Sequence, residues 1–381
     1  MASKTKLAVV ATEFQKTSET FIRDHVRVTQ PGGTLIIGQR TDGVEPALPS
    51  LSGLDLGAFP LAGEPRQSLG RLHRIWRRYL RPVLPRRDLD RLVAFLRAQA
   101  PKAVMAEYGP TGAMVAPAAQ LAEVPLFVHF HGFDATVIPR LPGWASRYRR
   151  LFQTAAGVIG PSAFITDKLR DLGCPSEKLH VSACGIDPDR FVAGTKEPGR
   201  LLAVGRLVNK KGPHLTIEAF GRVARDFPHA HLDLIGGGPL AEKCAGLVAK
   251  YDLESQVTLH GPQPHKRVAE LMGRASIFLQ HSLTTWMGET EGLPVSVLEA
   301  MASEVPVIAT RHSGIAEAVH DGVTGFLVEE RDVDGMATAI RNLLANPEIG
   351  DPLGPAARAR VLAHYTHARM GANLRRIMGL N

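Results

Sequence analysis

Short apolar runs rich in β-branched residues alternate with amphipathic stretches along almost the whole chain. Runs of this length are typical of buried strands, and the longer amphipathic stretches are typical of helices. In the first half, the predicted strands are 6–12, 34–39, 103–108, 125–131 and 157–162. After residue 199 the alternation restarts, with predicted strands over 200–207, 231–238, 257–262, 276–282, 305–310 and 325–330 and predicted helices over 213–226, 239–251, 265–274 and 333–346.

This alternation predicts the fold class. Buried strands separated by helices form βαβ units and a parallel sheet. The two halves meet in "GIDPDRFVAGTKEPGR", residues 185–200, which is rich in Gly, Pro and charge. We therefore expect an α/β protein with two doubly wound, Rossmann-like domains that are joined near residue 190 and face each other across a cleft. Open parallel sheets bind ligands beyond the carboxyl ends of their strands.

Length and composition agree with this picture. At 381 residues the chain is long enough for two domains, and its 44% hydrophobic and 22% charged residues are ordinary for a globular protein. No apolar run reaches the ~20 residues that span a bilayer, and the N-terminal "KTKLAVVATEF" fits a first strand better than a signal peptide. Three cysteines without metal-ligand spacing argue against a disulfide framework and a structural zinc site, so a reducing cytoplasm is the expected compartment.

Charge is distributed unevenly along the chain. Residues 1–187 contain 24 Lys+Arg and 16 Asp+Glu, a net charge of +8, whereas the remainder contains 21 of each. The densest basic stretch is 66–92, where arginines are interleaved with Leu, Ile, Trp76 and Tyr79. This stretch fits either a solvated helix face or a surface for anionic lipid headgroups or a phosphorylated acceptor. No motif supports nucleic-acid binding.

Two cations occupy a predicted strand-to-helix loop in the second half. In "LLAVGRLVNKKGPHLTIEAF", residues 201–220, Gly205, Arg206 and Lys211 precede a helix that starts near Pro213. Cations in front of a helix N-terminus make a site for a diphosphate. A basic loop without a ligand fits the same pattern.

Glycines follow two further predicted strands of this half. Gly237 and Gly238 belong to "LDLIGGGPL", and Gly261 follows His260 at the end of the next strand. Tight turns explain both sets, and His260 fits a strand-end residue. Glycine also lets the backbone approach a ligand closely, so all four positions are candidates for donor binding.

Two carboxylates flank the start of a predicted helix in "TEGLPVSVLEAMA", residues 290–302. Pro294 suits the first turn of a helix that runs to about Ser303, which places Glu291 in the entry loop and Glu299 inside the helix. The unpaired backbone N–H groups at the helix start are candidate donors to phosphate or hydroxyl groups. The carboxylate of Glu299 has acceptors for a pair of vicinal hydroxyls.

The first half offers one histidine site and one polar loop. In "LFVHFHGFDAT", residues 126–136, the alternation places His129 and His131 on one face of a strand, and His131 lies at the carboxyl end beside a glycine. A structural role and a ligand contact both fit His131. After the first strand, "EFQKTSETFIRDH" contains Ser18, Glu19 and Thr20; Ser18 fits a helix N-cap, and the three residues are candidates on the acceptor side.

Taken together, these motifs resemble the retaining, nucleotide-sugar-dependent glycosyltransferases of family 4, which have the GT-B fold. The resemblance covers nearly the whole chain and rests on the Glu-x7-Glu pair, the Arg-x4-Lys pair, "GGGP", "HFHG" and "GPSAFITDKLRDLGCPSEKLHVSACGIDPDRF" in the expected order. "SETFIRDH" and "TTWMGETEGLP" are most similar to members that build bacterial exopolysaccharide of the colanic-acid type. One departure is the loop after the first strand, "EFQKTSETF", where many relatives have Gly-Gly.

The resemblance implies a role for each motif. Residues 1–187 correspond to an acceptor-binding domain, 188–364 to a nucleotide-sugar-binding domain, and 365–381 to a helix that returns to the first domain. The implied catalytic residues are His131, Arg206, Lys211 and Glu291. The implied donor-binding residues are Gly205, Gly237, Gly238, His260, Gly261, Gly292, Leu293, Pro294 and Glu299.

By the same resemblance, Arg206 and Lys211 are expected to hold the diphosphate, Glu299 the ribose and Glu291 the transferred sugar. His131 is expected to contact that sugar near the reacting centre. The resemblance also implies a UDP- or GDP-sugar as the donor and a glycan or a lipid-linked glycan as the acceptor. The resemblance implies no obligatory metal, because such enzymes use basic side chains and helix ends where others use a bound metal. The position of the Asp-x-Asp sequences at 187–189 and 332–334, outside the expected cleft, agrees with this expectation. Alternatives are a sugar-nucleotide epimerase or phosphorylase, or a non-catalytic nucleotide-sugar-binding subunit. The expected location is the cytoplasm, with the inner face of the membrane as the alternative.

Overall fold

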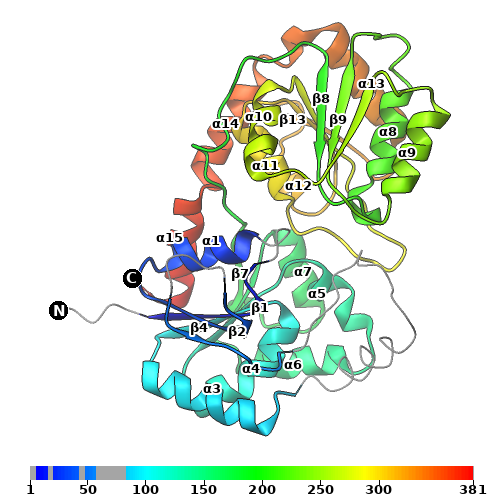
Figure 1. Ribbon diagram of the computed structural model, residues 1–381. Coiled ribbons are helices and arrows are strands. Elements are labelled where there is room, and N and C mark those ends of the chain that lie inside the picture. Colours follow the sequence, from blue (N-terminus) through cyan, green and yellow to red (C-terminus); the bar gives the residue numbers. More distant parts are fainter. Residues whose placement is uncertain (1–5, 16–19, 43–47, 57–82, 381) are drawn as a thin grey trace. The chain divides into compact units, whose positions relative to one another are not determined.

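The computed structural model describes residues 6–15, 20–42, 48–56 and 83–380 (Figure 1). The chain divides into two compact units. The described residues up to Gly185, together with the C-terminal segment from His367, form the first unit, and Ile186–Thr366 forms the second. Each unit contains one sheet with helices packed on it, and the described strand pairs are parallel. The predicted α/β class with two doubly wound sheets is confirmed.

The first unit has a sheet with strand order β3-β2-β1-β4-β5-β6-β7. Its strands are β1 (Leu7–Glu13), β2 (Thr34–Arg40), β3 (Ser50–Leu51), β4 (Ala103–Glu107), β5 (Leu126–His129), β6 (Gly157–Gly160) and β7 (Leu179–Val181). Its helices are α1 (Thr20–Thr29), α3 (Arg86–Gln99), α4 (Gly109–Leu121), α5 (Phe133–Thr136), α6 (Trp144–Thr154), α7 (Ala163–Asp171) and α15 (His367–Met378), with 3-10 turns at Ile138–Arg140 and Ser176–Lys178.

Both faces of this sheet are buried, which explains the continuous apolar runs of its strands. Alternate residues of β1 point to opposite faces: Ala8 and Val10 join a core with α3, α4 and α6, whereas Leu7 and Val9 join a core with α1 and α15. The α15 helix is far from α1 in the sequence but packs beside it (Figure 1).

The second unit has a sheet with strand order β10-β9-β8-β11-β12-β13. Its strands are β8 (Arg200–Val204), β9 (His231–Ile235), β10 (Val257–Gly261), β11 (Ile277–Gln280), β12 (Val307–Thr310) and β13 (Gly325–Val328). Its helices are α8 (Pro213–Gly221), α9 (Ala241–Lys250), α10 (His265–Arg274), α11 (Val295–Ala302), α12 (Ile315–Ala318), α13 (Val333–Ala345) and α14 (Leu353–His364), with 3-10 turns at Asn209–Lys211 and Pro347–Ile349. Residues of α8, α9 and α13 share one core with the strands.

Several element ends differ from the sequence prediction. The helix predicted over 213–226 ends at Gly221, because the chain continues in tighter turns, with Asp226 N–H bonded to the Val223 carbonyl. The strand predicted over 157–162 ends at Gly160, because the Ser162 hydroxyl caps α7. In the described part of the chain, no helix has the length and apolar composition that a membrane crossing requires, and all three cysteines are free and buried.

Candidate functional site

The loop between β8 and α8 places cations at the carboxyl edge of the second sheet. Gly205 and Arg206 follow β8 directly, and Lys211 ends the 3-10 turn that precedes α8. These three residues line a pocket at the carboxyl ends of β8, β9 and β11, and Pro213, the first residue of α8, lines it too. The pocket therefore combines basic side chains with a helix N-terminus, an arrangement that suits an anion.

Glu291 is held between two lysines. Its carboxylate oxygens lie 3.3 Å from Nζ of Lys211 and 3.6 Å from Nζ of Lys210. Lys210 also pairs with Glu289, at 2.9 Å. All four side chains are nearly buried, with exposed fractions from 9% to 14%. Charges buried to this degree need partners, and here each carboxylate has at least one ammonium group beside it.

The pKa of Glu291 follows from these neighbours. Burial alone raises the pKa of a carboxyl group, but the charges of Lys210 and Lys211 outweigh it and lower the pKa of Glu291 to about 2. Glu291 is therefore a carboxylate near neutral pH. It can accept hydrogen bonds from hydroxyl groups, and it has no proton to give as a general acid.

The loop from Glu291 to Pro294 is fixed before the helix begins. The Gly292 carbonyl accepts the Gly314 N–H at 2.9 Å and the Ser313 hydroxyl at 3.0 Å. Pro294 has an extended backbone and occupies the N-cap position, so α11 begins at Val295 and the prediction of Pro294 within the first turn is wrong by one residue.

Glu299 lies in the second turn of α11 and is 8% exposed. Its placement inside the helix, with Glu291 in the entry loop, confirms the local prediction.

The glycine turn after β9 packs against the cation loop. Leu207 N–H donates to the Gly237 carbonyl at 2.9 Å, and a Cβ on Gly238 would lie 2.6 Å from the Leu207 carbonyl oxygen. His260 lies farther along the edge, where its Nε2 is 2.6 Å from Asp233. The Gly261 carbonyl accepts the Gly236 N–H at 3.0 Å. Gly237 and Gly238 thus adjoin the cation loop, whereas the side chain of His260 is paired with Asp233.

In the first unit, the predicted His131 belongs to a buried cluster. The β4–β5 register places Glu107 opposite His129, and His131 follows two residues later. Glu107 bridges two imidazoles: one oxygen is 2.8 Å from Nε2 of His131 and the other is 2.7 Å from Nδ1 of His25. The rings of His129 and His131 stack with centroids 4.5 Å apart, which confirms that both lie on one face.

The turn after His131 is fixed by Asp134. The Asp134 carboxylate accepts backbone N–H groups of His131 at 2.9 Å, Gly132 at 3.1 Å and Gly109 at 2.9 Å. Gly132 has a φ of 124°, a conformation that favours glycine. The "HGFD" sequence therefore forms a rigid turn that orients the His131 ring.

The histidine cluster has strongly changed pKa values. Burial alone lowers the pKa of an imidazole, but hydrogen bonds with the Cys184 thiol and Glu107 raise that of His131 to about 9. Burial likewise raises the pKa of a thiol, yet bonds to His131 and His25 lower that of Cys184 to about 7. His129, buried beside two cationic rings, has a pKa well below the usual value.

Glu107, His129 and His131 could hold a divalent ion, because their ligand atoms lie within 4.8 Å of one another. The ion pairs of Glu107 with His25 and His131 already compensate the buried charge. No metal is needed to account for the burial of this cluster.

Some predicted site residues lie outside the described residues. These are Ser18 and Glu19, while Thr20 is the first residue of α1. Of the basic stretch 66–92, only the part from residue 83 is described, and α3 begins within it at Arg86.

The sequence prediction missed residues that reach the candidate sites from other elements. In the first unit these are His25, Glu107 and Cys184; in the second they are Lys210, Glu289, His312 and Glu330. Lys210 was recognisable as the neighbour of Lys211, and Glu289 as the neighbour of the acid pair. The others are brought to the sites by the packing of α1, which carries His25, and by the strand order and register of the two sheets.

Two family models together match residues 37–360. A glycosyl transferase 4-like domain matches residues 37–185, and a glycosyl transferases group 1 domain matches residues 186–360. The amylovoran biosynthesis glycosyltransferase AmsK of Erwinia amylovora is 35% identical over 240 residues, which are 62% of this chain and 59% of that protein. A protein of Salmonella typhimurium designated a colanic acid biosynthesis glycosyltransferase, WcaL, is 33% identical over 62% of this chain and 60% of its own length. The aligned region therefore spans about three fifths of each relative.

Solved structures share the fold over nearly the whole chain. HepE from Anabaena, in complex with UDP, has a TM-score of 0.76 at 16% identity and covers 98% of this chain and 99% of its own. The lipopolysaccharide outer core galactosyltransferase WaaB has a TM-score of 0.70 at 16% identity, with 98% and 99% covered. With its two parallel-sheet units and its two matching domain models, the chain belongs to the glycosyltransferases of the GT-B fold that combine a family 4-like domain with a group 1 domain.

Proposed function

We propose that this protein is a retaining glycosyltransferase that moves a sugar from a UDP- or GDP-sugar to a glycan acceptor carried on a lipid, in the synthesis of a bacterial exopolysaccharide. The observation that carries the proposal is Glu291 between Lys210 and Lys211, beside a pocket that borders the N-terminus of α8. Such a site offers cations to a diphosphate and a fixed carboxylate to sugar hydroxyls.

The comparisons support the choice of substrate class. HepE was crystallised with UDP and with UDP-glucose. A mannosyltransferase of Mycolicibacterium smegmatis that is 29% identical over 62% of this chain uses GDP-mannose and a phosphatidylinositol mannoside, according to its name. AmsK and WcaL are named for exopolysaccharide synthesis. These properties belong to those proteins and motivate the panel of donors tested below.

In the proposed reaction, charge develops on the leaving nucleotide. Arg206 and Lys211 hold the diphosphate and stabilise this negative charge, which is the largest contribution such a site can make. No metal ion is required in this role, so turnover should survive EDTA.

The remaining contacts hold the donor. Glu299 accepts hydrogen bonds from the ribose hydroxyls, and Glu291 accepts them from the transferred sugar, with the 292–294 backbone beside it. The contact proposed for His131 is with the transferred sugar near the reacting carbon. Residues 66–92 are proposed to contact an anionic membrane, where a lipid-linked acceptor resides.

The first step is to screen UDP-, GDP- and ADP-sugars for those that raise the melting temperature of the protein, because a ligand that binds only the folded state stabilises it. The test is then turnover with the sugars that bind. We expect nucleotide release and a product with retained anomeric configuration, and loss of at least ~10²-fold in kcat/KM in Glu291→Gln. Glu329→Gln is the matched control, because Glu329 is exposed and lies in the same unit. Absence of turnover with every donor, or full activity in Glu291→Gln, contradicts the proposal.

A further inference from the structure

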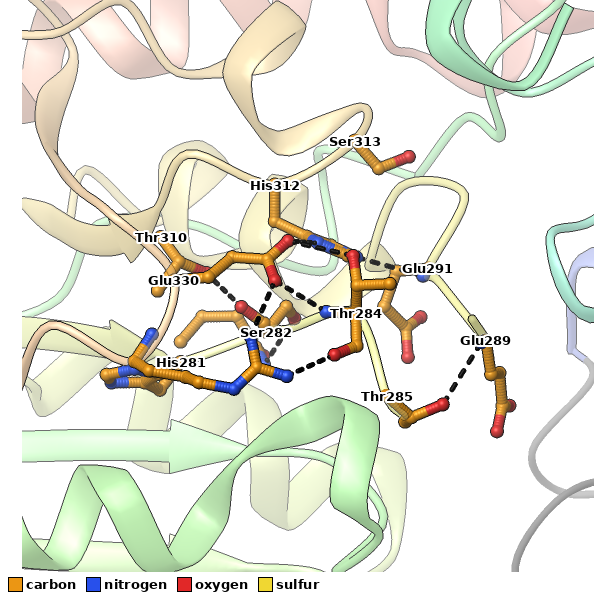
Figure 2. A network of polar contacts seen from close by, with 12 residues as sticks. His281, Ser282, Thr284, Thr285, Glu289, Glu291, Thr310, His312, Ser313 and Glu330 are labelled. Carbon is orange, nitrogen blue, oxygen red and sulfur yellow. Dashed lines mark hydrogen bonds and ion pairs between the residues drawn. The ribbon is translucent and has the colours of Figure 1, made fainter. Parts of the chain in front are cut away.

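The loop that carries Glu291 is braced by polar contacts from two other loops of the second unit (Figure 2). Within the loop, the Thr285 N–H donates to the Glu289 carbonyl at 3.0 Å, and the Glu289 N–H donates to the Thr285 hydroxyl at 3.0 Å. The ion pairs with Lys210 and Lys211 hold the side chains of the two glutamates. None of these contacts involves the backbone N–H of Glu291.

The side chain of His312 is the hydrogen-bond partner of the Glu291 N–H. His312 follows β12 by two residues, and its side chain is 1% exposed. The Glu291 N–H donates to Nε2 of His312 at 3.0 Å. An amide N–H can only donate, so Nε2 must present its lone pair, and the single proton of the neutral imidazole must reside on Nδ1.

Glu330 accounts for the position of that proton. Its Oε1 lies 2.5 Å from Nδ1 of His312. The same carboxylate accepts the Thr284 N–H at 2.7 Å and the Thr284 hydroxyl at 3.0 Å, which fixes its orientation. Burial raises the pKa of a carboxyl group, but bonds from His312 and Thr284 lower the pKa of Glu330 to about 2. Glu330 is therefore an obligate acceptor, and Nδ1 of His312 must donate to it.

The three residues thus form one directional chain, in which the Glu291 N–H donates to His312 and His312 donates to Glu330. With the other tautomer, a protonated Nε2 would oppose the Glu291 N–H and an unprotonated Nδ1 would oppose a carboxylate. Both contacts would then be repulsive, and the buried groups would lose their partners. The carboxylate of Glu330 therefore determines how the main chain at Glu291 is held.

We propose that His312 and Glu330 are positioning residues of the donor site: Glu330 keeps His312 in the Nδ1–H tautomer, and His312 holds the backbone of Glu291 so that its carboxylate stays between Lys210 and Lys211. The inference rests on the proposed function for the identity of the ligand, a nucleotide sugar. Misplacement of such a contact by about 1 Å costs orders of magnitude in rate, so a residue without ligand contact can still be required.

Two substitutions of His312 test the contact with the Glu291 N–H separately from the contact with Glu330. The side-chain amide of glutamine reaches as far as Nε2 of an imidazole, whereas that of asparagine reaches only as far as Nδ1. His312→Gln therefore retains an acceptor for the Glu291 N–H, and His312→Asn does not. His320→Gln and His320→Asn are the matched controls, because His320 is exposed in the same unit.

The first measurement needs no ligand. Hydrogen–deuterium exchange across residues 289–292 should be about five- to tenfold faster in His312→Asn than in the wild type, the factor that one lost hydrogen bond gives. Exchange in His312→Gln should stay near the wild-type rate. Equal exchange in wild type, His312→Gln and His312→Asn overturns the inference. The ring ¹⁵N shifts of His312 provide a second readout: they should report protonated Nδ1 and unprotonated Nε2, and the opposite tautomer also overturns it.

The second measurement addresses the donor. Once a nucleotide sugar has been found, His312→Asn should raise its Kd about tenfold or more and leave the Kd of the free nucleotide unchanged within a factor of two, and His312→Gln should restore most of the loss. An equal loss for sugar donor and free nucleotide would contradict a role specific to Glu291. If the wild type binds no nucleotide sugar at all, the proposed function fails, while the exchange and tautomer measurements still decide whether His312 and Glu330 act as inferred.

Discussion

At the scale of single residues, Lys210 and Lys211 are adjacent in the sequence and have different electrostatic surroundings. Burial lowers the pKa of both ammonium groups. For Lys210 the carboxylates of Glu291 and Glu289 outweigh burial and raise the pKa. For Lys211 the single partner Glu291 does not suffice, because Lys210 and Arg206 are also close, and the pKa is lowered. The positive charge of Lys211 is thus only partly balanced by Glu291. In the proposed function, the negative charge of a bound diphosphate would balance the rest.

The histidine cluster of the first unit allows a prediction about pH. In Glu107→Gln the pKa of His131 should fall below about 9, because burial lowers it and one of the two groups that outweigh burial, Cys184 and Glu107, has lost its charge. NMR titration of the ring protons measures this directly. Glu177→Gln, at an exposed position of the same unit, should leave the titration unchanged. An unchanged pKa of His131 in Glu107→Gln would show that Glu107 does not control its protonation.

The same substitution should change how stability depends on pH. The raised pKa values of His131 and His25, about 9 and 10, stabilise the fold below pH 6.5, and this stabilisation is lost as pH rises through those values. Cys184 acts in the opposite sense above pH 7, because its pKa is lowered, and offsets part of the loss. We expect the wild-type unit to lose on the order of 4 kcal/mol of unfolding free energy between pH 6.5 and 10, and Glu107→Gln to lose less. Denaturant unfolding at both pH values measures the difference.

At the scale of elements, glycine permits the approach of two loops at the candidate site. Gly236 has a φ of 142°, and a Cβ there would lie 1.9 Å from the Gly205 carbonyl oxygen. The turn after β9 therefore packs against the turn after β8 backbone to backbone, and no larger side chain fits between them. Glycine at position 236 is required for this packing whether or not the turn also touches a ligand.

This packing predicts the effect of Gly236→Ala. The added methyl group must displace the loop that begins at Gly205, so we expect a loss of about 2–4 kcal/mol in stability and weaker nucleotide binding. Gly246→Ala is the control: Gly246 is exposed in α9, nothing lies near its Cβ, and alanine there should be neutral or stabilise the helix by up to about 1 kcal/mol. Thermal unfolding and calorimetry of both variants compare them. Equal stabilities would mean that the two loops separate at little cost.

At the scale of the whole molecule, the C-terminal helix α15 belongs to the first unit, although the entire second unit precedes it in the sequence. Met370, Leu374 and Met378 are buried in a core with residues of α1 and β1. Arg375 donates to the carbonyls of Val28 and Thr29 at 3.1 and 3.0 Å. In the described residues from 83 onward, the chain thus passes into the second unit after Gly185 and returns to the first unit at His367, and the stability of the first unit depends on the last described residues.

Leu374→Ala tests this dependence. The side chain is 0% exposed, so its truncation should cost about 2–5 kcal/mol in the first unit. Hydrogen exchange should accelerate in β1 and α1 and stay unchanged in β8–β13. Leu362→Ala is the control, because Leu362 is 44% exposed on α14 of the second unit. Faster exchange in both units, or in neither, would contradict the assignment of α15.

The local sequence pattern was sufficient to predict where much of the candidate site in the second unit lies. Lys211 lies between a strand end and a helix start, and Glu291 and Glu299 lie on either side of Pro294 and the start of α11. Each of these residues is only a few positions from the local feature that predicts its place. The parallel α/β architecture likewise follows from buried runs separated by helices, because a parallel strand pair requires a crossover. The local pattern predicts helix ends less well than helix centres. The helix predicted over 213–226 ends at Gly221, because the turns that follow have hydrogen bonds of shorter span than those of an α-helix.

The sequence by itself thus determined the fold class and the placement of the cations and the acid pair, because short-range spacing controls both. Only the tertiary structure decided which side chains from distant segments meet. Glu107 joins His25 and His131 across 82 and 24 residues, and His312 joins Glu330 across 18. Such pairs depend on how helices such as α1, which carries His25, pack on a sheet, and on strand order and register, which bring the carboxyl ends of separate strands to one edge. The pattern of any single segment does not contain that information.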